Sequence, residues 1–240
     1  MKSFSGTDAG KVRRVNQDYI YTGDEPVGNL PNLFVVADGM GGHKAGDYAS
    51  RYAVDRVIEL AAQSADEDID KIVTDALVQV NKELIEEAMC DPDKEGMGTT
   101  FVAAVIDGDV LHAFNVGDSR LYLVNHAIRQ VTRDHSYVQE MVKNGRLNKK
   151  QARNHPRKNV ITRAVGVSPE LEVDVFTEKL NKGDEVLLCS DGLTNMVEDT
   201  LIEQIIKAGT DLVDEVTRLI AAANENGGID NISVVLIRPF

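Results

Sequence analysis

The sequence has few of the features that mark secreted or fibrous proteins. Its 240 residues include no tryptophan and only two cysteines, Cys90 and Cys189. Two cysteines are too few for a disulfide scaffold, and neither has a partner at C-x-x-C spacing, which disfavours a structural zinc site. This cysteine usage fits a reducing compartment best, so we expect a cytoplasmic protein.

Long hydrophobic runs are also missing. Residues 1–8 hold no apolar stretch that could form the core of a signal peptide. Uninterrupted apolar runs such as residues 33–37 are far too short to cross a bilayer. The sequence therefore predicts no contact with a membrane.

Positive charge is scarce overall, but it is concentrated in one segment. Lys and Arg number 26 against 39 Asp and Glu, for a net charge of −13. Duplex binding depends on many Lys and Arg contacts to phosphates, so we expect no nucleic-acid partner. Residues 133–163, by contrast, hold nine basic and two acidic side chains, a local net charge of +7. Such asymmetry often marks a surface that faces an anionic ligand, although a solvated helix and loop is the plainer alternative.

Hydrophobic patterning predicts both strands and helices. Apolar steps of three and four predict helices within residues 49–60 and 69–85, with Ser64 and Glu67 as a capping box, and a later pair within 201–206 and 212–220. The Asp107-Gly108 pair predicts a tight hairpin. Short runs rich in Val, Leu and Ile predict strands at 33–37, 101–106, 110–116, 121–124, 186–189 and 232–237.

The order of these elements indicates the fold class. Paired helices alternate with groups of hairpin strands, which favours an α/β (α+β) layered sandwich over a strictly alternating parallel sheet. No repeat or low-complexity linker interrupts the chain, so we expect a single domain over residues 1–240. The basic segment 133–163 is then a polar helical insertion.

Carboxylates recur at the ends of the predicted strands. Asp38, Asp118 and Asp191 each follow a strand, Asp230 precedes one, and Asp18 lies in an Asn-Gln-Asp triplet. Aspartate at a strand end is often only a turn former. If these ends converge, their oxygens form a cage that selects Mg²⁺ or Mn²⁺, because crowded carboxylates repel one another unless a cation intervenes.

Glycine follows two of these carboxylates, as Gly39 and Gly192. We expect each glycine to let the backbone approach a ligand closely.

Other chemistries find little support in the sequence. An EF-hand is excluded because Leu77 falls where loop position twelve needs a bidentate Glu. Lys44 falls where a G-x-G-x-x-G motif needs its third glycine, and no P-loop motif occurs. A thiol phosphatase needs an Arg six residues after its Cys, but Gly96 and Asn195 occupy those positions. Water activated by a metal ion is what remains.

Six short motifs follow one another along nearly the whole chain. They are Arg13-Arg14-Val15-Asn16-Gln17-Asp18, Ala37-Asp38-Gly39-Met40-Gly41-Gly42-His43, Gly96-Met97-Gly98-Thr99-Thr100, Val116-Gly117-Asp118-Ser119-Arg120, Ser190-Asp191-Gly192-Leu193 and Asp230-Asn231-Ile232-Ser233. In this order and spacing they resemble the bacterial branch of the metal-dependent PPM (type 2C) protein serine/threonine phosphatases.

The resemblance implies two mainly antiparallel sheets flanked by helix pairs, with a site for two Mn²⁺ or Mg²⁺ ions at one end. Asp38 matches the carboxylate that bridges both metals, and the Gly39 carbonyl matches a ligand of the second. Asp191 and Asp230 match ligands of the first metal.

The resemblance also implies roles around these two metals. Asp18 matches an acid that acts through metal-bound water, and Asp118 matches a residue that helps to hold a weaker third metal. Arg13 matches the arginine that grips the substrate phosphate. Residues 133–163 include the region of the family's flap.

One position departs from eukaryotic members of the family. They carry a histidine after the Asp-Gly pair, proposed as the general acid, but this chain has Met40 there. A thioether cannot donate a proton. His43, three residues later, is a candidate for contacting substrate or relaying a proton.

The resulting hypothesis is a phosphatase that hydrolyses phosphoserine and phosphothreonine in proteins by attack of a metal-bridging hydroxide. We expect its partners to be phosphorylated proteins, including a Ser/Thr protein kinase that it opposes, and we expect a monomer. The alternatives are a metal-dependent phosphodiesterase or nuclease and a catalytically silent module that binds phosphoproteins.

Overall fold

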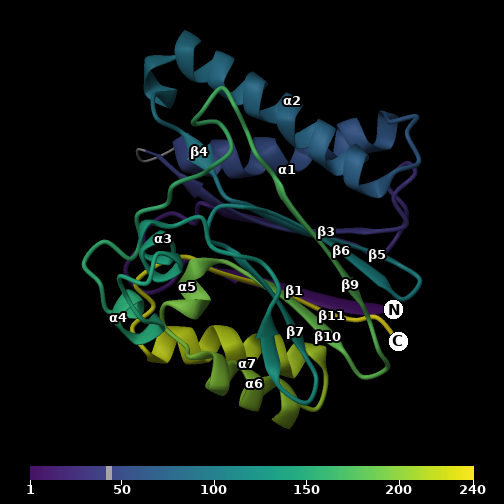
Figure 1. Ribbon diagram of the computed structural model, residues 1–240, viewed down its shortest axis with the longest axis vertical. Coiled ribbons are helices and arrows are strands. Elements are labelled where there is room, and N and C mark those ends of the chain that lie inside the picture. Colours follow the sequence, from purple (N-terminus) through teal and green to yellow (C-terminus); the bar gives the residue numbers. More distant parts are fainter. Residues whose placement is uncertain (42–44) are drawn as a thin grey trace.

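Two antiparallel β-sheets pack face to face in the computed structural model, which describes residues 1–41 and 45–240 (Figure 1). The first sheet has the order β1 (Lys2–Asp8), β11 (Ile232–Arg238), β10 (Glu185–Cys189), β7 (Arg120–Val124) and β8 (Ile128–Gln130). The second has the order β2 (Asp18–Gly23), β3 (Leu33–Met40), β5 (Phe101–Asp107), β6 (Val110–Val116) and β9 (Asp174–Lys179), and the short β4 (Gly98–Thr99) pairs with β3.

Paired helices cover the outer face of each sheet. On the second sheet lie α1 (Ala45–Gln63) and α2 (Ile69–Cys90), followed by the 3-10 turn η1 (Pro92–Lys94); on the first lie α6 (Asp199–Ala208) and α7 (Leu212–Glu225). The shorter α3 (Tyr137–Lys143), α4 (Lys149–Arg153) and α5 (Asp191–Thr194) lie at the end of the sandwich away from both termini (Figure 1). Within the described part of the chain, no helix is both long and apolar enough to cross a membrane. The expected layered sandwich of two sheets and helix pairs is confirmed.

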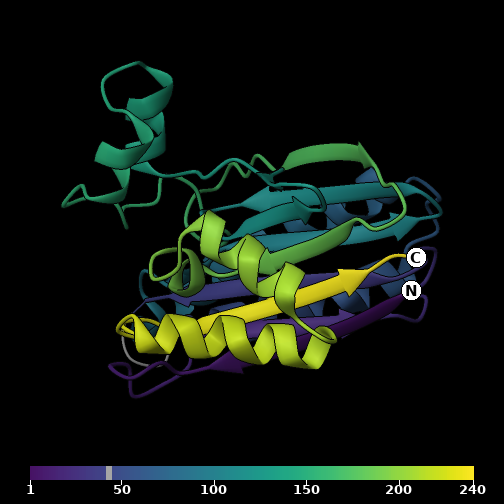
Figure 2. The same ribbon diagram turned by 90° about the horizontal axis from the view of Figure 1, so that it is seen from below.

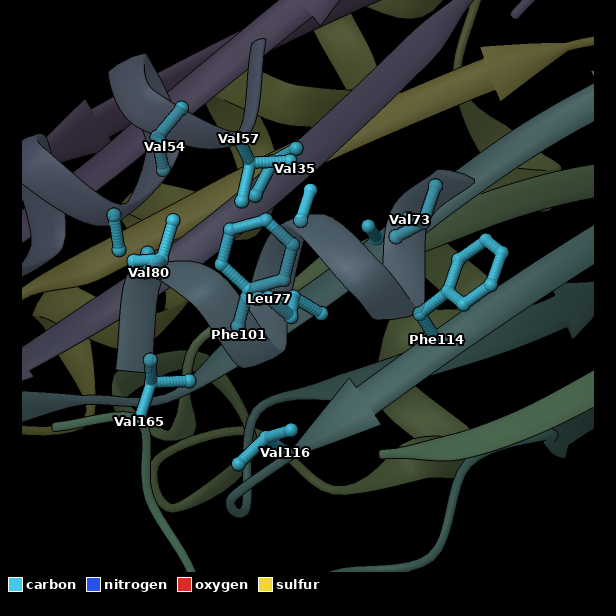
Figure 3. Packing of buried hydrophobic residues seen from close by; sticks show 14 of the residues in the cluster. Val35, Val54, Val57, Val73, Leu77, Val80, Phe101, Phe114, Val116 and Val165 are labelled. Atoms are coloured by element: carbon cyan, nitrogen blue, oxygen red, sulfur yellow. The ribbon is translucent and has the colours of Figure 1, made fainter. Parts of the chain in front are cut away.

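Apolar side chains fill each interface between the layers. Leu77 and Val80 of α2 pack with Phe101 and Phe114 of the second sheet, and all four are fully buried (Figure 3). A separate cluster between the two sheets joins residues such as Val36 to residues such as Val235. Each fully buried side chain of this size contributes roughly 1.5–3 kcal/mol relative to an exposed one, so these layers hold the strand ends in fixed positions.

The strands predicted from apolar runs are all present, and they share one property. They correspond to β3, β5, β6, β7, β10 and β11, the interior strands of the two sheets. The predicted hairpin also forms, because Asp107 pairs with Val110 and Gly108 adopts a φ of +60°. Strands β1, β2, β8 and β9 were not predicted, and each lies at a sheet edge. Edge strands face solvent, so their sequences lack a continuous apolar run.

The predicted capping box before α2 is wrong. Asp68, not Ser64, caps this helix, and its carboxylate accepts from the backbone N–H groups of Asp70 and Lys71. The Ser64 hydroxyl instead accepts from the N–H of Asp66 in the preceding turn. A carboxylate directly before the first turn also interacts favourably with the helix dipole, so the helix begins later than the pattern of Ser64 and Glu67 suggests.

Residues 133–163, called the flap below, contain two short helices. The flap carries α3 and α4, which project from the sandwich (Figure 2). The two chain segments at its base are hydrogen-bonded to each other. The Tyr137 N–H donates to the Val160 carbonyl and the Thr162 N–H donates to the His135 carbonyl, both at 2.8 Å. The base of the flap is therefore tied, whereas its helices extend outward.

Asn81 of α2 anchors the chain just after the flap. Its buried side chain donates to the Ser168 carbonyl at 2.8 Å and accepts from the Gly166 N–H at 2.7 Å. A side chain that satisfies one acceptor and one donor of the same loop fixes that loop in one position.

We expect Asn81→Leu to destabilise the protein by about 1–3 kcal/mol, because it leaves buried backbone groups of the loop without partners. Urea unfolding followed by circular dichroism measures the change. Lys82→Ala, at the exposed neighbouring position of the same helix, serves as the control and should change stability by less than about 0.5 kcal/mol. Equal effects of the two substitutions would contradict the anchoring role.

Candidate metal and phosphate site

The fold brings the predicted carboxylates together at the end of the sandwich that carries α5. Asp18 opens β2 and pairs in register with Asp38 near the end of β3. Asp191 is the first residue of α5, directly after β10, and Asp230 lies just before the neighbouring strand β11. Asp118 follows β6. Residues more than two hundred positions apart in the chain therefore meet because their strands end at one edge.

Hydrogen bonds hold one oxygen of several of these carboxylates. The Ser190 hydroxyl donates to Asp18 Oδ2 at 2.7 Å, and Asn195 Nδ2 donates to Asp191 Oδ2 at 2.8 Å. Each partner thus occupies one oxygen of its carboxylate and restricts the orientation of that side chain.

Asp38 is held through its backbone rather than through its side chain. Its N–H donates to the Thr100 hydroxyl at 2.9 Å, and its carbonyl accepts from the Thr99 hydroxyl at 3.0 Å. The two threonines thus fix the strand while the carboxylate points into the site.

Burial and mutual repulsion raise the pKa values of this cluster. Burial raises the pKa of Asp18 to about 7, with further contributions from the charges of Asp191 and Asp230. Burial, followed by the charge of Asp230, raises the pKa of Asp191 to about 6. The pKa values of Asp38 and Asp118 also lie well above the ordinary range, again mainly through burial. Without a compensating cation, the cluster is electrostatically unfavourable.

Two oxygens of the cluster show what kind of ligand fits. Asp18 Oδ1 and Asp191 Oδ1 are buried, and neither has a hydrogen-bond partner in the described part of the chain. Burying a carboxylate oxygen without a partner costs free energy. A hard divalent cation is the partner that fits an all-oxygen set of ligands. Over residues 1–41 and 45–240, no three acidic, His or Cys side chains are close enough to chelate one ion as they stand.

The structure shows a close contact at each of the glycines that follow two of the carboxylates. A Cβ on Gly39 would lie 2.0 Å from the Gly46 carbonyl oxygen, and one on Gly192 would lie 1.9 Å from the Asn231 carbonyl oxygen. The close approach in the structure is thus between backbone segments of the protein itself. These contacts draw the α1 segment toward β3 and the α5 segment toward the Asp230 loop.

Arg13, the predicted phosphate ligand, lies at the rim of the cluster. Its side chain is about half exposed and donates to Asp230 Oδ2 at 2.9 Å. The guanidinium is therefore at the site but paired with a carboxylate. His43, the second predicted substrate contact, lies outside the described residues.

Asn231 is a site residue that sequence reasoning did not single out. Its buried side chain accepts from the Gln17 N–H and donates to the carbonyls of Ala9 and Val15, all within 2.9–3.1 Å. It therefore clamps the loop that carries Arg13 against Asp230.

Ser190 and Asn195 were also missed, although both lie close in sequence to Asp191. A small polar residue beside each candidate aspartate was the available signal.

Comparisons with known proteins agree with this geometry. A family model described as Protein phosphatase 2C matches residues 5–233. The chain belongs to this family. It is 44% identical over 238 residues to the serine/threonine phosphatase stp of Listeria monocytogenes, covering 96% of this chain and 93% of that protein.

Solved structures show the same architecture in this phosphatase family. The serine/threonine phosphatase Stp1 of Staphylococcus aureus is 32% identical and superposes with a TM-score of 0.90 over 98% of this chain and 93% of that chain. The catalytic domain of the serine/threonine protein phosphatase PstP, solved in complex with 2 manganese ions, is 32% identical with a TM-score of 0.86 over 98% and 96% of the two chains.

We expect the metal-free protein to be less stable at pH 8 than at pH 5. The raised pKa values of Asp18 (about 7) and Asp191 (about 6) mean that the folded state binds more protons than the unfolded state between about pH 4 and 7. The free energy of unfolding therefore falls as the pH rises through this range.

The Asp38→Asn substitution tests the same repulsion directly. In EDTA at pH 8 this variant should have a higher Tm than wild type, by about 2–4 °C for each kcal/mol of repulsion removed. Differential scanning fluorimetry measures the shift, with Asp55→Asn on the exposed face of α1 as the control. A Tm of the Asp38→Asn variant at or below that of wild type would be evidence against a strained carboxylate cluster.

Proposed function

We propose that this protein phosphatase 2C family member removes phosphate from phosphoserine and phosphothreonine in proteins, using divalent cations. The observation that carries the proposal is the buried carboxylate cluster, with the unpaired oxygens of Asp18 and Asp191 and a guanidinium at its rim. The serine/threonine phosphatases of Listeria and Staphylococcus, similar over nearly the whole chain, support this substrate class.

Two Mn²⁺ or Mg²⁺ ions fit the donor set. Asp38 would contact both, with the Gly39 carbonyl on one side and Asp191 and Asp230 on the other, and Asp118 would contribute to a weaker third site. The manganese ions bound to PstP support this assignment. When bound, such ions lower the pKa of water and offset the negative charge of a phosphate.

The chain's own residues orient the substrate and the reacting groups. Arg13 would bind phosphate oxygens through a planar, bidentate contact, and it would leave Asp230 to do so. Asp18, whose carboxylate accepts a hydrogen bond from Ser190, would orient water beside Asp38. Met40, next to Gly39, has no proton to give to the leaving alkoxide. A group other than Met40 must therefore protonate the leaving alkoxide.

The partners and setting follow from the sequence. A Ser/Thr protein kinase in the same cell would supply the phosphoproteins. A cytoplasmic location, a monomeric state and a single domain over residues 1–240 stay predictions.

A phosphothreonine peptide tests the function directly. With Mn²⁺ present, the purified protein should release phosphate, and EDTA should abolish the release. Asp38→Asn should lower kcat/KM by more than about a hundredfold, since loss of groups behind metal ligands already costs 10–100-fold. Malachite green detection of phosphate measures turnover. Cleavage of a cyclic dinucleotide or single-stranded DNA instead of the peptide would favour the phosphodiesterase alternative, and no turnover of either would favour the silent module.

Arg13 offers a narrower test. We expect Arg13→Ala to lower kcat/KM for the peptide by about 10–100-fold, mainly through KM, because a charged hydrogen bond to phosphate contributes roughly 1.5–3 kcal/mol. Arg14→Ala removes an exposed guanidinium one residue away and serves as the matched control. If both variants lose activity equally, Arg13 has no specific role in phosphate binding.

A further inference from the structure

A cavity of about 750 Å³ lies between the flap and the start of α6. Asp118 and Asp191 form part of its wall, so the cavity opens onto the carboxylate cluster. The flap supplies the opposite wall through residues of α3 and α4, which stand away from the sandwich (Figure 2). A substrate bound at the cluster would therefore have room beside it for further side chains.

The flap wall of this cavity is cationic. Arg133, Lys149, Lys150 and Lys158 all line it. Among the residues that the structure describes, none of these four side chains forms an ion pair or a hydrogen bond with another side chain. Four uncompensated cations around one cavity attract an anionic group.

The acidic residues of the cavity outside the cluster are already engaged. Arg120 binds Asp134 through two nitrogens, at 2.7 and 3.0 Å. Asp199 accepts from the Tyr122 hydroxyl at 3.1 Å, and Glu198 faces Arg153 at 3.8 Å. Asp134 and Glu198 are therefore paired with arginines, whereas Asp199 keeps its negative charge, so outside the cluster the four cations of the wall outnumber the one carboxylate that has no cationic partner among the described residues.

The cationic wall and the carboxylate cluster share this cavity. Lys158 of the flap and Asp191 of the cluster both line it. An anionic group bound at the flap wall would therefore lie in the same cavity as a phosphate bound at the cluster.

The cationic wall is supported by local structure. The Arg157 guanidinium stacks over the Tyr137 ring at 3.9 Å and joins the segment before Lys158 to α3. Asn148 and Gln151 form a reciprocal capping box that starts α4 at Lys149. The lysines thus extend from a helix with a defined start rather than from an unstructured loop.

We propose that this cavity is a second anion subsite, which binds an acidic or phosphorylated side chain of the same protein whose phosphoresidue lies at the carboxylate cluster. This inference rests on the proposed function. Because the cationic side chains and two aspartates of the cluster line a single cavity, we place the second anion within a few positions of the phosphoresidue. The preferred substrates are then acidic or multiply phosphorylated segments.

Three sets of peptides test the subsite. Each peptide carries one phosphothreonine, and the positions one to three residues away on either side carry glutamine, glutamate or phosphoserine. The quantity measured is the ratio of kcat/KM for each charged peptide to that for its glutamine counterpart. We expect wild type to prefer the charged peptides by about three- to tenfold, the size typical of a few partly exposed ion pairs. The preference should shrink in about 0.5 M NaCl.

Two double variants of the flap, one on the cavity wall and one away from it, test the role of the lysines. The double variant Lys149→Gln/Lys150→Gln removes two charges from the cavity wall, whereas Lys143→Gln/Arg146→Gln removes two exposed flap charges that do not line it. We expect the preference to fall toward one in the first variant and to persist in the second. Circular dichroism verifies that both variants fold.

The outcomes separate the two proposals. If wild type hydrolyses the glutamine peptides without preferring any charged peptide, or if both double variants lose the preference equally, the subsite is wrong and the proposed function stands. If wild type hydrolyses none of the peptides, the proposed function itself fails. A preference for phosphoserine alone identifies the second anion as phosphate, and a preference for both identifies a general anion site; either outcome supports the subsite.

Discussion

The arrangement of this protein depends on holding several buried carboxylates close together against their mutual repulsion. Burial and neighbouring charge raise the pKa values of Asp18, Asp38, Asp118 and Asp191, so the cluster by itself opposes folding. The opposing stabilisation comes from elsewhere in the molecule: from the paired strands β2 and β3, from the apolar layers between sheets and helices, and from the partners of individual carboxylate oxygens. The rigid sandwich is thus the condition for a site that only a cation completes.

The small polar residues around the cluster connect this strain to function. Ser190 and Asn195 each occupy one carboxylate oxygen, and the other oxygen of each carboxylate has no partner among the described residues, as the proposed binding of a cation requires. Asn231 ties the Arg13 loop to the same place, so the group that would bind phosphate and the groups that would bind cations share one support. Acidic side chains gather at the strand ends, whereas basic side chains without side-chain partners among the described residues lie on the flap.

Predictability from the sequence differs between the interior and the edges of the sheets. Interior strands such as β5 and β11 are buried on both faces, so an apolar run marks them. The edge strands β1 and β2 contain polar residues, so no continuous apolar run identifies them. Strand β1 in addition pairs with β11, at the other end of the chain. The start of α2 was misplaced for a similar reason, because several acidic residues compete to cap it.

The sequence by itself determined the fold class, the candidate aspartates and the chemistry of their oxygens, because hydrophobic periodicity and ligand type are written in local residue patterns. Only the tertiary structure decided that Gly39 and Gly192 serve close contact between backbone segments, that Arg13 is paired with Asp230, and that the basic flap encloses a cavity beside Asp191. These features depend on which distant segments meet when strands from both sheets end at one edge. That meeting is a property of packing in three dimensions, which no short stretch of the chain contains.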